Sequence, residues 1–525
     1  MKKYLFIIVI TFLASACEDM MKEDPINKLS INSDSDLEFA LSGLYHQFTT
    51  ITGGMYLLCN KDDVAIINYS SNMGNGNCSK QGTQTAPDDS YLLALYLPLY
   101  KTIACANDIF SKSKTLDRKD PKIFHLLGEA YFIRAYSYFW LVRMFGQVPI
   151  IDNVDVSYTV KKATILEIYR FVENDLQTAI NMLPNSNNEA RFTNVTPQRG
   201  SAKALLAEVY LSWAGYPLKE FSMYMKAART AKDVIDSAAY FGFSLMDDMA
   251  DLWNGKHNIN HEAIFAFHAS ATYSETNLYG QQEGIKMLAT DNYFPPIVQG
   301  EPAIKFYNAF PNNYRKDVSY YHKQQYVYQP VCFVDSLNPS KTYCPPAETL
   351  EYRIDSINLC STMYFGKNDL NLYSNNTSNS TNSYYSPYEN RNKCRVIYMI
   401  RYAHTLLTYA EAKARAGELD ASVFEAVNQV RRRANKVDLH SPSVYDLSYE
   451  LTAQQVADSV FWERAWEFCA EPEGRWFDLL RLELIPKLAS FKDKRQGVTY
   501  PITIDTKTCF FPIPKVDLNL DLNLQ

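Results

Sequence analysis

The sequence predicts a mostly α-helical protein, in which paired helices form a scaffold and an irregular, loop-rich region packs against it. Apolar residues recur at helical spacing in two blocks, at about 35–240 and about 396–482. The stretch between them, about 241–395, is rich in Tyr, Asn, Ser and Pro and has few clear periods. With 525 residues, 47% of them hydrophobic, the chain can bury a large core.

The first block contains a strong helix signal that ends at a glycine. One face of a helix requires apolar or small residues every three or four positions, and this spacing joins Leu126, Ala130, Ile133, Ser137, Trp140 and Met144. Gly146 provides a helix stop, and Pro149 prevents a restart. We therefore expect a helix that ends at about residue 145.

Two N-terminal caps mark further helices in this block. Thr164 and Glu167 have the spacing of a capping box. Thr196 is expected to be an N-cap, with Pro197 at the first helical position. The apolar stripes predict helices over 164–183, 202–213 and 222–236.

The second block contains two helical stripes joined by a short turn. Their apolar or small positions are Ala403, Leu407, Ala410 and Ala414 in the first and Val423, Val427, Val430 and Ala434 in the second. Gly417 is expected to end the first helix. Two helices with small residues at their contact resemble a tetratricopeptide-type hairpin, and because no strict period of about 34 residues occurs, the repeats should be degenerate.

The first residues have the features of a bacterial lipoprotein signal peptide. A basic start, an apolar run over 4–13 and three small residues precede Cys17. We expect a signal peptide over 1–16, too short to span a bilayer, acylation of the Cys17 thiol, and a tether over 17–34. Several acyl chains would hold the protein firmly at a membrane, since each buried methylene contributes roughly 0.8 kcal/mol.

Charge and cysteine spacing exclude two classes of partner. A formal net charge of -6 argues against nucleic acid. Of the 10 cysteines, nine follow Cys17, and none stands in a CxxC pair of the kind that zinc ribbons use. Cys332, Cys344 and Cys360 share one loop-rich stretch and could include a disulfide, but their spacing leaves the connectivity open.

A charged run near the C-terminus could be read as catalytic acids with cationic helpers. Its members are Glu463, Arg464, Glu467, Arg475, Asp478 and Arg481. We interpret them, together with Glu411 and Arg401, as ion pairs that fix helix register. No GxSxG, P-loop or HExxH motif occurs, and no Glu lies between His257 and His261. We therefore expect no enzyme activity, no cofactor and no metal.

Six segments, in order, resemble the hallmarks of the SusD/RagB family. The first is LLGEAYFIRAYSYFWLVRMFGQVPII (126–151), which is similar to the family's Glu-x-x-x-x-x-Arg-Ala-Tyr helix ending in Phe-Gly-x-Val-Pro. The others are RGSAKALLAEVYL (199–211), IRYAHTLLTYAEAKARAGE (400–418), VNQVRRRAN (427–435), FWERAWEFCAEPEGRWFDLLRL (461–482) and the terminal FPIPKVDLNLDLNLQ. The spacing around Pro472 and the missing proline near the C-terminus depart from the family pattern.

This resemblance implies a nutrient-binding outer-membrane lipoprotein of Bacteroidetes. It implies a single domain over 35–525, with a helical scaffold and a C-terminal tail over 483–525. Such a protein faces the extracellular side, captures an oligosaccharide or peptide, and delivers it to a SusC-like TonB-dependent transporter. The sequence leaves the choice between glycan and peptide open.

Tyrosine-rich loops are the expected ligand surface. Tyr accounts for 38 of the 525 residues, and its ring can stack while its hydroxyl forms hydrogen bonds. By the resemblance, loops 66–93 and 270–299 correspond to the family's ligand surface. The family's detailed contacts do not carry over; from the Tyr content we predict a shallow, solvent-open site there, with Tyr69, Tyr91, Tyr279 and Tyr293 as candidate contacts. The six Trp residues are expected mostly in the core.

Two other functions remain open from the sequence. The chain could be a surface hydrolase with its active site in the middle region, or an assembly scaffold whose helical hairpins only contact proteins. Conversion of labelled glycans or peptides to product would favour the hydrolase. A neighbouring gene for a large β-barrel with a plug domain would favour the binding lipoprotein over the scaffold.

Overall fold

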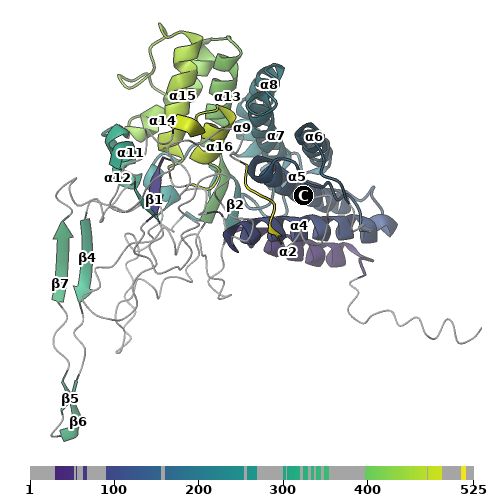
Figure 1. Ribbon diagram of the computed structural model, residues 1–525, viewed down its shortest axis with the longest axis horizontal. Coiled ribbons are helices and arrows are strands. Elements are labelled where there is room, and N and C mark those ends of the chain that lie inside the picture. The colour runs from purple at the N-terminus through teal and green to yellow at the C-terminus, as the bar shows by residue number, and fades with distance from the viewer. Residues whose placement is uncertain are drawn as a thin grey trace, which may run out of the picture.

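The computed structural model of the chain (Figure 1) describes residues 30–52, 55, 63–67, 90–154, 160–253, 257–268, 300–302, 304–319, 323–328, 333–335, 338–343, 348–353, 396–469, 471–487 and 510–515. Its helices are α2 (Asp34–Thr49), α4 (Ser90–Lys112), α5 (Pro121–Phe145), α6 (Ile165–Met182), α7 (Arg199–Ala214), α8 (Ser222–Asp236), α9 (Ala238–Phe241), α11 (Ile304–Ala309), α12 (Tyr314–Ser319), α13 (Tyr402–Arg415), α14 (Ala421–Ala434), α15 (Ala453–Glu467) and α16 (Arg475–Arg481). Its strands are β1 (Ala65–Ile67), β2 (Ala263–His268), β3 (Gly300–Pro302), β4 (Lys323–Tyr328), β5 (Phe333–Asp335), β6 (Asn338–Tyr343), β7 (Glu348–Arg353) and β8 (Val396–Arg401).

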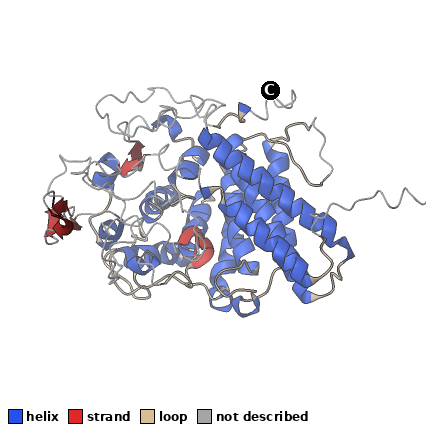
Figure 2. Cartoon of the chain, turned by 90° about the horizontal axis from the view of Figure 1, so that it is seen from below, coloured by secondary structure: helices blue, strands red, loops and turns tan. Residues whose placement is uncertain are grey.

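Successive helices pack against one another along most of the chain. The series runs from α2 through α4, α5, α6 and α7 to α8, which contacts α13, and α13 contacts α14 and α15. Figure 2 shows that most of the described chain is helical, with several long helices packed side by side. One hydrophobic core contains side chains from Leu37 on α2 to Ile513 near the C-terminus. The prediction of a mostly α-helical scaffold is therefore confirmed, and the two predicted helical blocks share one core.

Helix α5 has the sequence signals of both of its ends. The Asp120 side chain accepts a hydrogen bond of 2.8 Å from the Lys122 amide, and Pro121 occupies the first turn. Gly146 follows the helix with a φ of 69°, a conformation that side chains with a Cβ rarely adopt. A Cβ at Gly146 would also lie 3.2 Å from the ring of Phe510. The predicted end at residue 145 is confirmed.

The two predicted caps have different outcomes. The capping box is confirmed, because the Thr164 amide donates to Glu167 Oε2 at 2.7 Å and the Glu167 amide donates to Thr164 Oγ1 at 3.2 Å. The cap at Thr196 is wrong, because α7 begins after Gln198. The Thr196 hydroxyl instead accepts a 3.1 Å hydrogen bond from the Phe192 amide and closes the preceding turn.

The helices of the second block follow their turn signals. Gly417, with a φ of 81°, stands after α13, as predicted. Asp420 caps α14 by accepting a 2.9 Å hydrogen bond from the Ser422 amide. The last part of the second predicted block is divided between two helices, α15 and α16. Pro472 lies between them, and proline cannot continue a helix.

The stretch 241–395 is less irregular than predicted. Strands β2 and β8 pair antiparallel, and their side chains are almost all buried. Both are short apolar runs rich in β-branched and aromatic residues, which is the signal of a buried strand. Short helices α11 and α12 follow, and the ladders β4–β7 and β5–β6 form an arm that points away from the helices in Figure 1.

Candidate functional site

The two segments predicted to bind ligand are joined at their bases. Strand β1 leads into segment 66–93, strand β3 follows segment 270–299, and Ile67 pairs with Gly300 in the antiparallel register. The start of the first segment therefore lies beside the residue that follows the second. Of the candidate contacts, Tyr69, Tyr279 and Tyr293 lie outside the described residues, and Tyr91 lies in the first turn of α4.

The predicted loop 66–93 is too long at its C-terminal end. Helix α4 begins at Ser90, so residues 90–93 are helical. The reason is a stripe at helical spacing whose side chains are buried in the main core: Leu92, Leu95, Tyr96 and Leu99. The spacing of these apolar residues is visible in the sequence, so the start of the helix could have been predicted from it.

A small apolar cluster holds the paired bases on the scaffold. We define the stem cluster as the buried residues Val64, Phe306, Phe310, Ala465 and Cys469. Val64 directly precedes β1, Phe306 belongs to α11, and Ala465 belongs to α15. Full burial of a side chain such as Phe contributes about 1.5–3 kcal/mol, so these contacts tie β1 and α11 firmly to α15.

A buried ion pair also fixes the same base. Arg475 donates from Nε and Nη2 to Asp63 Oδ1 and Oδ2 at 2.8 and 2.9 Å. The Arg475 guanidinium also lies over the rings of Phe461 and Trp462, at 4.1 and 4.7 Å from their centroids. A bidentate pair sets orientation as well as distance. Arg475, predicted to pair within the helices, therefore anchors the chain just before β1.

Aromatic side chains lie half-buried beside the stem cluster. Trp462 and Trp466 stack with centroids 6.0 Å apart, and Trp466 also meets Phe310 at 6.3 Å. The Lys316 ammonium lies 3.9 Å from the Tyr307 ring centroid. We call Trp462, Trp466 and Tyr307 the stem aromatics. Trp140, Trp213, Trp253 and Trp476 are buried, as expected for core residues, whereas Trp462 and Trp466 are partly exposed. Trp462 and Trp466 have i, i+4 spacing, which places both on one face of a helix, and this spacing was the sequence signal for the pair.

The charged motifs form a first buried network around Arg401. Arg401 Nη1 donates to Glu262 and Glu467 at 2.5 and 2.9 Å, and its other nitrogens donate to Glu471. Arg315 donates to Glu463 at 2.6 Å and to Glu467 at 3.0 Å. All of these side chains are buried. The network joins Glu262, which directly precedes β2, to α12, β8 and α15, so it holds the middle region against the second helical block.

A second network surrounds Glu411. Arg481 Nη2 donates to Glu411 at 2.6 Å and to Asp478 at 2.8 Å, and Arg464 Nε donates to Asp478 at 2.9 Å. Burial would raise the pKa of Glu411, but Arg481, Arg415 and Arg464 together hold that pKa well below its usual range. Arg464 and Arg481 likewise lower the pKa of Asp478 against the effect of burial. These carboxylates are ionised and enclosed by cations, which suits a structural role.

The charged residues of the first hallmark helix are also paired. Arg134 donates to both carboxylate oxygens of Asp175, at 2.8 and 2.7 Å. Glu129 accepts from Arg191 at 2.8 Å and from the Tyr45 hydroxyl at 2.7 Å. These pairs link α5 to α6, to the loop before α7 and to α2.

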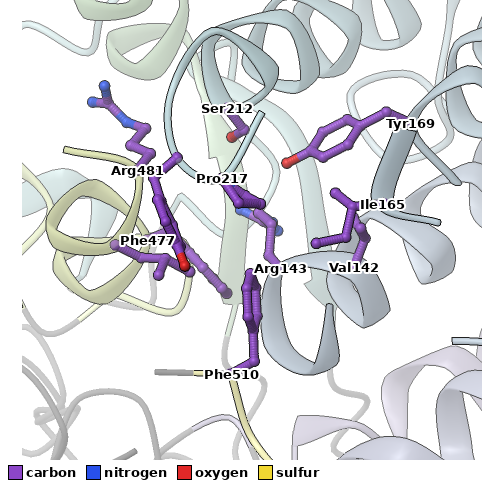
Figure 3. Close-up of a pocket in the computed structure, with 11 residues that line it drawn as sticks. Val142, Arg143, Ile165, Tyr169, Ser212, Pro217, Phe477, Arg481 and Phe510 are labelled. Carbon is purple, nitrogen blue, oxygen red and sulfur yellow. The ribbon is translucent and has the colours of Figure 1, made fainter. Parts of the chain in front are cut away.

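A cleft lies between the ends of α5 and α7, the start of α6, and α16 (Figure 3). Tyr169, Pro217 and Phe510 line it with largely apolar surface. Two cations also line it, but both have partners: Arg143 donates to Glu473 at 2.7 Å, and Arg481 donates to Glu411. The cleft thus offers no unpaired charge for a polar ligand.

Comparison with known proteins gives matches over nearly the whole chain. Residues 19–211 match the family described as "Starch-binding associating with outer membrane", and residues 220–525 match the SusD family. SusD-like protein P2 of Formosa agariphila is 28% identical over 509 residues, which cover 92% of this chain and 91% of that protein. Two crystallised relatives share the fold. A SusD homologue from Bacteroides thetaiotaomicron has a TM-score of 0.74 at 23% identity and covers 96% of this chain and 98% of its own. A laminarin-binding SusD-like protein has a TM-score of 0.63 at 19% identity and covers 91% and 97%.

Proposed function

This chain belongs to the SusD/RagB family, and from that premise we propose that it is a lipid-anchored, non-enzymatic binding protein of the outer cell surface. It captures an oligosaccharide and delivers it to a SusC-like TonB-dependent transporter in the outer membrane. The family is associated with the outer membrane. Among the described residues, no helix combines the length and apolarity that a membrane crossing requires. A glycan is favoured over a peptide because the N-terminal family is described as starch-binding and one structural neighbour as laminarin-binding.

The pairing of Ile67 with Gly300 is the observation that carries this proposal. It sets the start of segment 66–93 beside the residue that follows segment 270–299, and this supports a shared site, because recognition loops are commonly presented on a rigid scaffold. The stem aromatics lie against the same base. Aromatic rings can stack on the apolar face of a sugar while nearby polar groups form hydrogen bonds. The proposed site therefore combines the stem aromatics with the candidate contacts Tyr69, Tyr91, Tyr279 and Tyr293.

The networks around Arg401 and Glu411 support binding without cleavage. Glycoside hydrolysis needs two carboxyl groups that converge on the scissile bond, one of them protonated. Glu411, Glu463, Glu467 and Asp478 are buried and paired with arginines. These four carboxylates cannot reach a polymer at the surface, so the charged motifs give the hydrolase alternative no support.

Calorimetry and product analysis test the proposal together. The purified chain is titrated with starch oligosaccharides, laminarin oligosaccharides and a peptide mixture, and each sample is then analysed for cleavage. We expect saturable binding of a glycan that is recovered intact. Binding of peptides alone would replace the glycan by a peptide, and cleavage products would establish the hydrolase.

Aromatic truncation locates the site. Trp466→Ala, and separately Tyr91→Ala with Tyr293→Ala, should each weaken binding by about 1–3 kcal/mol through loss of stacking, roughly 5- to 150-fold in Kd. Phe39→Ala is the matched control, because Phe39 is an exposed aromatic on α2, away from α11 and α12 in Figure 1. Unchanged affinity in both site variants would move the site elsewhere and leave the family-level function standing.

A further inference from the structure

Lys316, on α12, is a buried cation that has no carboxylate partner among the described residues. The residue is 8% exposed. In the same part of the chain, every buried arginine forms an ion pair with a carboxylate: Arg134, Arg143, Arg315, Arg401, Arg432, Arg433, Arg464, Arg475 and Arg481. Lysine is almost never buried without such a partner, so Lys316 departs from the rule that the other buried cations follow.

The surroundings of the Lys316 ammonium offset its charge only in part. Nζ lies 3.9 Å from the Tyr307 ring centroid and donates a 3.3 Å hydrogen bond to the Phe310 carbonyl. An ammonium has three donors, and this bond uses one of them. Removal from water lowers the pKa of Lys316, and the nearby Asp317 carboxylate opposes this effect only in part. The cation is therefore less well stabilised than in water, and a negatively charged neighbour would stabilise it.

The position of Lys316 connects this cation to the proposed ligand site. The ring beside the ammonium belongs to Tyr307, one of the stem aromatics. Phe310, whose carbonyl accepts from Lys316, lies with its ring centroid 6.3 Å from that of Trp466, a second stem aromatic. Tyr307 and Trp466 are partly exposed. A sugar that stacks on Trp466 would therefore place its substituents on the side of the cluster where the ammonium lies.

We propose that Lys316 selects glycans that carry a carboxylate or a sulfate, by supplying the ammonium that pairs with this group. The inference rests on the proposed function and deepens it by naming the substrate class. Lysine binds carboxylate and sulfate groups as a point charge, and a charge pair away from bulk water is stronger than one in it. A cation that is incompletely compensated in the free protein reduces its stability, and functional sites commonly hold such groups.

Calorimetry with chemically matched glycans tests the proposal on the full chain purified in detergent. The probes are starch, laminarin and galacturonan oligosaccharides, each prepared in a neutral form, a form with carboxylates and a form with sulfates. We expect a charged form to bind roughly 10- to 100-fold more tightly than its neutral counterpart, and the form that does so identifies the group. This preference should shrink at about 1 M salt, because salt screens the charge pair.

Two substitutions separate recognition from a structural role. Lys316→Met removes the charge and keeps an apolar stem beside Tyr307, whereas Lys316→Arg retains the charge. The preference for the charged form should disappear in Lys316→Met, with neutral binding unchanged, and should largely persist in Lys316→Arg. Lys226→Met is the matched control. The Lys226 ammonium lies 5.3 Å from the Tyr210 ring centroid, but its side chain is 50% exposed and has Glu173 at 3.8 Å. This variant changes the net charge equally and should keep the preference.

Urea unfolding adds a readout that a structural cation would move in the opposite direction. Because a buried charge without a partner destabilises a protein, Lys316→Met should have a urea midpoint at or above that of the wild type. A midpoint clearly below it would show that the fold itself uses the charge, and would overturn the inference. Equal affinity of the wild type for neutral and charged forms, or an undiminished preference in Lys316→Met, would overturn it as well. Binding of no probe in any form would refute the proposed function on which the inference rests.

Discussion

Arg464→Ala should destabilise the fold and leave ligand affinity intact, because Arg464 belongs to the buried network around Glu411. Its side chain is 2% exposed. Nε donates to Asp478 at 2.9 Å, and Nη1 donates to Thr408 Oγ1 at 3.1 Å and to Glu208 at 3.4 Å. Alanine would remove all of these interactions and leave a cavity beside two carboxylates.

The size of the effect follows from what remains after the substitution. Removing one partner of a buried ion pair costs about 3–5 kcal/mol, mostly because the other charge stays buried without compensation. Asp478 would keep its 2.8 Å contact with Arg481, so we expect a loss near the lower end, about 3 kcal/mol. Lys122→Ala is the matched control. It also breaks an ion pair, to Asp34 at 2.6 Å, but both side chains are well exposed, and such pairs contribute little.

Urea unfolding followed by tryptophan fluorescence measures this loss. Arg464→Ala should lower the urea midpoint clearly, and Lys122→Ala should hardly change it. The double variant of Arg464→Ala with Asp478→Asn should lose less than the two single losses added together, because removing both partners leaves no stranded charge between them. An unchanged midpoint in Arg464→Ala, combined with lost glycan binding, would refute the scaffold interpretation and place Arg464 in a site.

Two further predictions concern the lipid anchor and the loss of folding stability at low pH. Cys17→Ala should release the protein from the outer-membrane fraction, because no acyl chain can be attached; retention at the wild-type level, measured by fractionation and immunoblotting, would contradict the lipoprotein assignment. For Asp420, hydrogen bonds from Lys413 and Ser422 lower the pKa to about 2. Because this folded-state pKa is below the unfolded value of about 3.9, Asp420 stabilises the fold above about pH 4, and this contribution is lost as pH falls towards 2. Asp420→Asn keeps an N-cap, so its urea midpoint should fall less between pH 5 and pH 2 than that of the wild type; parallel pH profiles would contradict this.

Local signals in the sequence predicted most of the helical scaffold. Gly146 and the Thr164 capping box each act within a few residues of the helix end they define, so their positions could be read directly. Thr196 shows the limit of this reading, because its hydroxyl had a competing local partner at Phe192. The break between α15 and α16 was visible only as an altered spacing around Pro472.

The base of the proposed site depends on contacts between distant parts of the chain. Strands β1 and β3 have three residues each, too few for a period, and Ile67 meets Gly300 only in the folded molecule. The partner of Arg475 is Asp63, 412 positions away. The residues around either one do not indicate that the two form an ion pair. Whether Trp462 and Trp466 are covered likewise depends on how α11 docks, which composition does not specify.

The fixed contacts at the paired strands β1 and β3 also affect how the sequence of such a protein can change in evolution. With Ile67 paired to Gly300 and Asp63 held by Arg475, the start of segment 66–93 and the residue that follows segment 270–299 stay fixed to the scaffold. Doubling a flexible loop then costs only about 0.6 kcal/mol in closure entropy, which is small beside the contacts that hold the scaffold. Evolution, or an engineer, can therefore vary the chain beyond these fixed points without redesigning the framework beneath them.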